Sequence, residues 1–191
     1  MKRCCTVLIA FILGFCLCAA AEARQPQNYK DFKAMYQDEG RTPEGAVRMH
    51  FQALFCYMDP AMRAEAGKML RYSMHLPEPL EQNRNMGTFL RRLKDPALHH
   101  IFRSYCKGSS PSNNYAMNPD SFTLSFAGKR QEADYLKVFL RSSGADSPRP
   151  VWVKKYDGLW YTINNSSIYL KVREPKSARD SRRNAHDADY D

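Results

Sequence analysis

Apolar positions recur with two different periods along the chain, helical at first and alternating later. Over residues 42–58, Val47, Phe51, Leu54 and Met58 fall on one stripe of a helix. The segment opens with a threonine, a proline and a glutamate, an order typical of a capped helix start. The pattern therefore predicts a long helix that buries one face.

Two further helices are expected before residue 107. Asp59 and Pro60 form a second helix-start signal, and apolar residues at helical spacing continue from there to about Tyr72. Two prolines break the pattern over residues 75–79, because proline cannot continue a helix. Residues 86–94 then carry apolar side chains at helical spacing, and a short helical turn is expected through Ile101.

The second half of the chain alternates between apolar and polar residues. This pattern predicts strands over residues 122–126, 134–141, 150–156 and 159–163. Asp157-Gly158 lies between the last two strands and favours a two-residue hairpin turn. Helices followed by antiparallel strands indicate an α+β fold, with N-terminal helices packed on a curved sheet of about four strands, in a cone-like arrangement.

Polarity divides the chain into four segments. Residues 1–23 are interpreted as a signal peptide, and residues 24–40 as a loose polar lead-in with room for a short helix. Residues 41–173 form the single expected α+β domain. Residues 174–191 contain almost no apolar side chains, so a disordered charged tail is predicted.

The first 23 residues indicate export. Met-Lys-Arg precedes an apolar run from Val7 to Ala21, and Ala-Glu-Ala then ends at Ala23. A basic start, an apolar stretch and a small-residue exit are typical of a secretory signal. We expect a periplasmic or extracellular protein, which would meet the membrane only through an uncleaved signal segment. Lipid attachment at a cysteine of this segment stays an alternative.

Charge and composition narrow the class of partner. The chain has 191 residues, 43% hydrophobic and 26% charged, with a formal net charge of +9. These values fit a globular domain. The densest basic run, residues 84–107, lacks the repeated basic and aromatic pattern of single-strand binders and is interpreted as a solvated helix face. The expected partner is a polar or anionic small ligand, or an envelope protein. Specific binding to a nucleic acid is not expected.

Two cysteines, Cys56 and Cys106, follow the expected signal segment. Export permits a disulfide, and we expect one between them. Two buried free thiols are the alternative. Neither cysteine has neighbours at metal-ligand spacing, so no metal or other cofactor is predicted.

Two motifs resemble a bacterial domain family of unknown function. Residues 103–115 read RSYCKGSSPSNNY, and residues 141–150 read RSSGADSPRP. Members of that family carry R-S-Y-F-x-G-x-x-P-x-N-N-Y followed by S-S-G-A-D-S-P-R-P. The likeness covers about residues 41–174, and Cys106 stands where an aromatic residue is usual, which adds to the case for a local disulfide.

A wider likeness is to nuclear-transport-factor-like cone domains, which include SnoaL-like enzymes. Such domains often open with a T-P-E-x-A helix and end with a hairpin of the kind expected over residues 152–163. This resemblance implies a pocket between sheet and helices. The fold hosts enzymes, ligand binders and scaffolds, so it does not choose among them.

The motif loops supply the candidate ligand-binding residues. The planar guanidinium of arginine binds anions, and amide side chains bind sugars. Both groups also form the hydrogen bonds that stabilise loops. If these side chains point apart or bond one another, the ligand hypothesis fails. The candidates are Arg103, Asn113, Asn114, Tyr115, Arg141, Ser143, Asp146 and Arg149.

Three functions remain open, and a non-catalytic binding or interaction module is favoured. A small SnoaL-like hydrolase or isomerase is the second, and it needs His50 beside an acidic partner in one pocket. A structural domain of an envelope assembly is the third, and it predicts an exposed apolar patch without a pocket.

Overall fold

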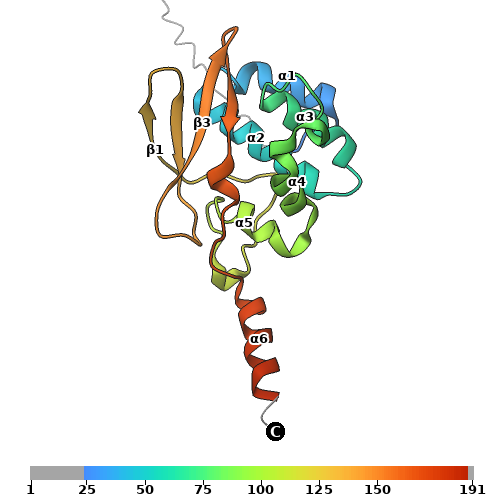
Figure 1. Cartoon of the computed structure of the whole chain (residues 1–191), viewed down its shortest axis with the longest axis vertical. Helices are drawn as coiled ribbons and strands as arrows, with labels where there is room; N and C mark the ends of the chain where they lie inside the picture. The colour runs from blue at the N-terminus through green and yellow to red at the C-terminus, as the bar shows by residue number, and fades with distance from the viewer. Residues whose placement is uncertain (1–23, 189–191) are drawn as a thin grey trace, which may run out of the picture.

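A computed structural model describes residues 24–188, with side chains described as far as residue 186. Helices pack against one side of a four-stranded antiparallel sheet, so the fold is α+β as predicted (Figure 1). The expected signal segment, residues 1–23, lies outside the described residues.

The central element is α2, Pro43–Met58, which the apolar stripe predicted. Thirteen of its 16 residues are buried, because α1, α3, α4 and the sheet all contact it. The Thr42 hydroxyl accepts a hydrogen bond from Gly45 N at 3.0 Å and caps the helix start.

The expected lead-in is a helix of the folded domain, and this corrects the prediction for residues 24–40. Helix α1 runs over Tyr29–Glu39, and Asn28 caps it by accepting a hydrogen bond from Asp31 N. Phe32 and Tyr36 are fully buried. Tyr29 and Met35 also pack against the core, while most polar residues of the helix are exposed, so one narrow apolar stripe holds it.

The other helices are short. Helix α3, Arg63–Ser73, starts four residues after Asp59, where the restart was expected. Helix α4, Gly87–Lys94, lies within the predicted range, and α5 covers His99–Arg103. Five 3-10 turns join these elements, over Leu80–Gln82, Arg84–Met86, Pro96–Leu98, Pro111–Asn113 and Ser166–Tyr169.

The sheet is a meander in which each strand pairs with the next. Its last three strands lie where alternation predicted them: β2 at Leu136–Leu140, β3 at Arg149–Tyr156 and β4 at Leu159–Asn164. Asp157 and Gly158 turn the β3–β4 hairpin with φ of 47° and 86°. Both angles are positive, as the predicted turn requires.

The first strand was predicted at the wrong place. Strand β1 is Phe126–Gln131, and all six residues are exposed. The segment before it buries Phe122 and Leu124, and Leu124 makes only an isolated bridge to Cys106. The alternating pattern over residues 122–126 therefore belongs to a partly buried loop. Strand β1 itself has no apolar face, so no alternating pattern predicts it.

The C-terminal segment forms helix α6, Lys176–Ala188, which corrects the predicted disordered tail as far as residue 188. It projects away from the body of the molecule (Figure 1). Ion pairs along the helix, such as Lys176 Nζ to Asp180 Oδ2 at 2.5 Å, support it in place of an apolar face. Among the described residues, no helix combines the length and apolar character needed to cross a membrane.

Candidate ligand-binding surfaces

Six of the eight candidate residues lie where two loops meet the segment after β4. Asn113 holds its own loop: its side-chain oxygen accepts from Ser110 N and its amide donates to Gly108 O, both at 2.8 Å. Asn114 adopts the left-handed conformation, with φ 55°, and its side-chain oxygen accepts from Ser177 N at 2.9 Å. Both amides are therefore engaged with the backbone.

Tyr115 is fully buried and holds the C-terminal segment. Its hydroxyl donates to Arg173 O at 2.6 Å. Gly144 lies against the same ring, since a Cβ atom at that position would be 2.2 Å from the Tyr115 hydroxyl and 2.9 Å from Val172 Cβ. Only glycine fits here, because the motif loop and the C-terminal segment close around one tyrosine.

Three more candidates complete this structural contact. Ser143 donates through both its backbone N and its hydroxyl to Ser104 O, at 2.9 and 3.1 Å. Arg149 donates to the backbone oxygens of residues 170 and 171, at 2.8 Å each. Asp146 forms an ion pair with Arg173. We call these contacts the C-terminal junction, formed by residues 104–115, 142–149 and 170–177.

Each of these six side chains is bonded to the backbone or to Arg173, and these contacts favour a structural role for them. Arg103 and Arg141 differ, since neither side chain makes a hydrogen bond or ion pair within the described residues. Arg103 lines two hollows of about 550 and 570 Å³ on either side of α5. Arg141 is exposed at the end of β2.

His50 is fully buried inside the helical core rather than in a pocket. Its Nε2 accepts from the Asn165 amide at 3.1 Å, and its Nδ1 lies 2.9 Å from the Ser73 hydroxyl. That hydroxyl donates to Leu70 O, so the imidazole carries its proton on Nδ1. Burial lowers the pKa of His50 to about 3. The acidic partner that the enzyme alternative requires is replaced by a serine and an asparagine.

Cys56 and Cys106 are free and buried, which corrects the expected disulfide. Burial raises the pKa of each thiol to about 12. Cysteine count and export only permitted a bridge, and as small apolar side chains both residues fit a packed core without one.

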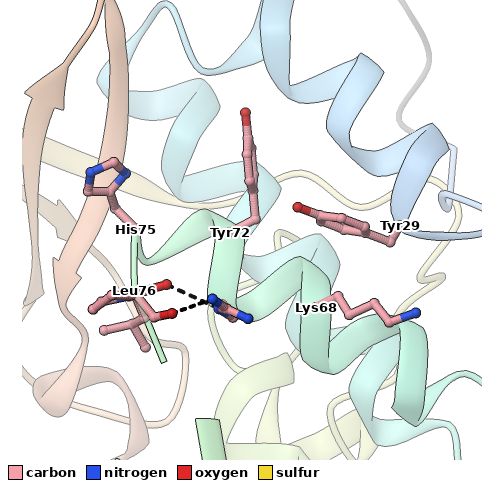
Figure 2. Close-up of a pocket in the computed structure, with 7 residues that line it drawn as sticks. Tyr29, Lys68, Tyr72, His75 and Leu76 are labelled. Carbon is pink, nitrogen blue, oxygen red and sulfur yellow. Dashed lines mark hydrogen bonds between the residues drawn. The ribbon is translucent and has the colours of Figure 1, made fainter. Parts of the chain in front are cut away.

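A large open hollow lies beside α3, away from the motif loops. It measures about 740 Å³ and is lined by Tyr29, Lys68, Arg71, Tyr72, His75 and Leu76. Figure 2 shows Tyr29 entering from α1, Lys68 and Tyr72 from α3, and His75 on the side of the strands. Arg71 donates to Leu76 O at 3.2 Å and to the next backbone oxygen, which fixes the turn that closes one end.

Two of the lining residues, Tyr72 and His75, belong to a larger aromatic cluster. The Tyr36 and Tyr161 rings stack at 5.5 Å, and Tyr72 meets Tyr36 edge-on at 5.2 Å. His75 adopts a φ of 52°, and its exposed ring stacks on Tyr156 with centroids 4.4 Å apart. The rings join α1, α3 and the β3–β4 hairpin, so the walls are held by the core.

A second hollow of about 540 Å³ shares Lys68 and Arg71 with the first. It adds Arg63, Lys94 and a single carboxylate, Glu81. We call the two together the α3 groove. Its larger part has no carboxylate in its lining, although Glu65 pairs with Lys68 nearby, at 2.5 Å. The groove is therefore cationic and offers aromatic rings.

Sequence reasoning missed the groove because its residues come from separate segments. Tyr29 belongs to the expected lead-in, and His75 belongs to the proline-rich break. The one usable signal was the grouping of Lys68, Arg71 and Tyr72 just before that break. A helix that ends in basic and aromatic residues beside prolines combines a fixed turn with side chains suited to binding.

The comparisons with known proteins identify the family. A family model described as Domain of unknown function (DUF6935) matches residues 24–176. The chain belongs to this family. The match starts before α1, so α1 is part of the DUF6935 domain and only α6 extends past it. The comparison with curated proteins gave no match, and neither did the comparison with solved structures.

Proposed function

We propose that this DUF6935 chain is an exported, non-catalytic binding domain that holds a polar or anionic ligand, or an acidic segment of an envelope protein, in the α3 groove. The observation that carries the proposal is the larger hollow of the groove, where tyrosine rings, Lys68, Arg71 and His75 line a space without a carboxylate.

The chemistry of the groove suits an anion with a flat or apolar face. Lys68 is exposed, and its ammonium group pairs with Glu65 at 2.5 Å in an open position, where an anionic ligand competes with that carboxylate. Tyr29 and Tyr72 offer ring faces, and burial raises the pKa of Tyr72 to about 12, so its hydroxyl stays a neutral hydrogen-bonding group. The aromatic rings provide contact area at a low cost in side-chain entropy, and the cationic side chains orient the negative charge of the ligand.

A binding role is also supported by how the titratable groups are placed. His50 spends both ring nitrogens on hydrogen bonds inside the core. His75 faces the groove, but the residues that line its part of the groove include no carboxylate to pair with it. The lining of this hollow therefore contains no histidine–carboxylate pair of the SnoaL type.

Export is supported by the sequence of residues 1–23, with its basic start, apolar run and A-x-A exit. The test is native mass spectrometry of the protein purified, without reducing agent, from the envelope of its own host. A covalent mass that corresponds to cleavage after Ala23 supports export. An intact N-terminus contradicts cleavage.

The same spectra test the groove through paired variants. A non-covalent mass present on the wild type should be lost in Lys68→Gln and Tyr29→Ala. It should be kept in Lys155→Gln and Tyr135→Ala, which change the same residue types on the sheet. A hetero-complex lost in the groove variants alone supports an acidic protein segment as the ligand. A bare monomer in every sample contradicts the proposal.

A further inference from the structure

A small pocket between α4 and the segment after β4 collects positive charge. It measures about 240 Å³ and lies apart from the α3 groove, with which it shares no lining residue. Arg91 and Arg92 reach it from α4, and Lys171 reaches it from the C-terminal segment. His100 lines the same pocket and donates from Nδ1 to Ala97 O at 2.8 Å, which leaves Nε2 available.

Arg92 is held in place at this pocket, and one of its donors has no acceptor. Its guanidinium carbon lies 5.6 Å from the centroid of the Tyr169 ring. That ring packs on Phe89 of the core at 5.4 Å, so the platform under the guanidinium is fixed. Arg92 Nη1 is buried without a hydrogen-bond partner in the described structure. That atom has almost no accessible surface, so an anion in the pocket would bind the other guanidinium donors of Arg92.

The protein places one carboxylate at this pocket, and that carboxylate is paired elsewhere. Glu174 is the single carboxylate in the lining, and it pairs with Arg182 of α6. Within the described residues, Arg91, Arg92 and Lys171 have no ion-pair partner. Three cations around a small pocket repel one another unless an anion lies between them.

We propose that this pocket binds a tetrahedral oxyanion, a phosphate or sulfate group, with Arg92 as its fixed anchor and Arg91 and Lys171 as flanking cations. The planar guanidinium donates two parallel hydrogen bonds to such a group. The volume is smaller than the roughly 300 Å³ at which pockets for drug-sized ligands begin, and it suits a compact anion with its waters. The group is either a free anion or the head of a phospholipid.

The test is isothermal titration calorimetry of the full chain with inorganic phosphate, at low and constant ionic strength. We expect saturable binding by the wild type and at least about a tenfold weaker affinity in Arg92→Gln. The double variant Arg91→Gln, Lys171→Gln should also weaken binding, and it covers the case in which Arg92→Gln fails to fold. Lys155→Gln, a matched loss of one exposed cation on β3, should bind as the wild type does.

Two results would overturn the proposal. One is a wild type that shows no saturable phosphate binding up to roughly 10 mM, a concentration well above typical weak dissociation constants. The other is an equal loss of affinity in Lys155→Gln, which would mean general charge attraction. A second titration with phosphatidylglycerol vesicles separates the sources: competition with phosphate supports a lipid headgroup, and binding of phosphate without competition supports a free anion.

Discussion

The C-terminal junction and the α3 groove use similar side chains in opposite ways. In the junction, Tyr115 and Arg149 donate to backbone oxygens and are thereby committed to holding loops. In the groove, Arg71 also donates to backbone oxygens, but Tyr29 stands at the surface of a 740 Å³ hollow and Lys68 pairs with a carboxylate, not with the backbone. Residue type alone therefore does not mark a binding site. What matters is whether the backbone has already taken the hydrogen-bonding capacity.

The largest expected difference is between two tyrosines. Tyr115→Ala should lower the free energy of unfolding by about 3–5 kcal/mol, because it empties a fully buried position and removes the hydrogen bond to Arg173 O. Tyr29→Ala, at a half-buried groove position, should cost no more than about 1 kcal/mol. Urea denaturation measures both. Equal losses would erase the contrast between junction and groove.

Two glycines should respond with opposite sign. Gly144→Ala places a Cβ atom 2.2 Å from the Tyr115 hydroxyl and should destabilise the fold by about 1–3 kcal/mol. Gly67→Ala, inside α3 and 3.8 Å from Tyr57, should stabilise it by about 0.5–1 kcal/mol, because alanine favours the helix. Thermal unfolding followed by circular dichroism gives the sign of each change. A stabilising Gly144→Ala would contradict the tight closure of the junction.

The buried histidine sets a smaller, pH-dependent effect. The pKa of His50 is about 3 in the folded protein against 6.5 in the unfolded chain, so only the unfolded chain takes up this proton between those values. Stability should therefore fall by about 1.4 kcal/mol per unit as pH drops below 6.5. Burial also lowers the pKa of His99 and His100, which adds to the slope.

Urea denaturation at pH 7 and pH 5 measures this slope, above the range in which carboxylates begin to titrate. His50→Gln should reduce the slope, whatever its effect on absolute stability. An unchanged slope in this variant would show that the folded protein accommodates a charged His50.

Local patterns predicted the parts of the fold whose burial is periodic. The stripe of Val47, Phe51 and Leu54 gave α2, and alternation with Asp157-Gly158 gave β3, β4 and their turn. Strand β1 and helix α6 were missed because they bury almost nothing. Helix α1 was interpreted as a lead-in, with room for a short helix, because only two of its residues are fully buried.

The site was harder to predict than the fold. The motifs led correctly to a domain family of unknown function, but their arginine and asparagine residues were candidates only because they form hydrogen bonds. Sequence does not say whether the partner of Asn113 is a ligand or its own loop. Nor does it place Tyr29 against Tyr72, 43 positions later, at a ring distance of 6.1 Å.

The exposed edge strand β1 has a consequence for how the protein behaves in concentrated solution. An unpaired strand edge is a template on which a second copy can add a strand. Lys129 and Arg130 place charge on this edge, where they pair with Glu44 at 2.7 Å and Glu132 at 2.9 Å. Exposed charges act on a second molecule only over the Debye length, about 10 Å at 0.1 M salt and about 3 Å at 1 M. High salt therefore screens the charged side chains that guard this edge against intermolecular sheet growth.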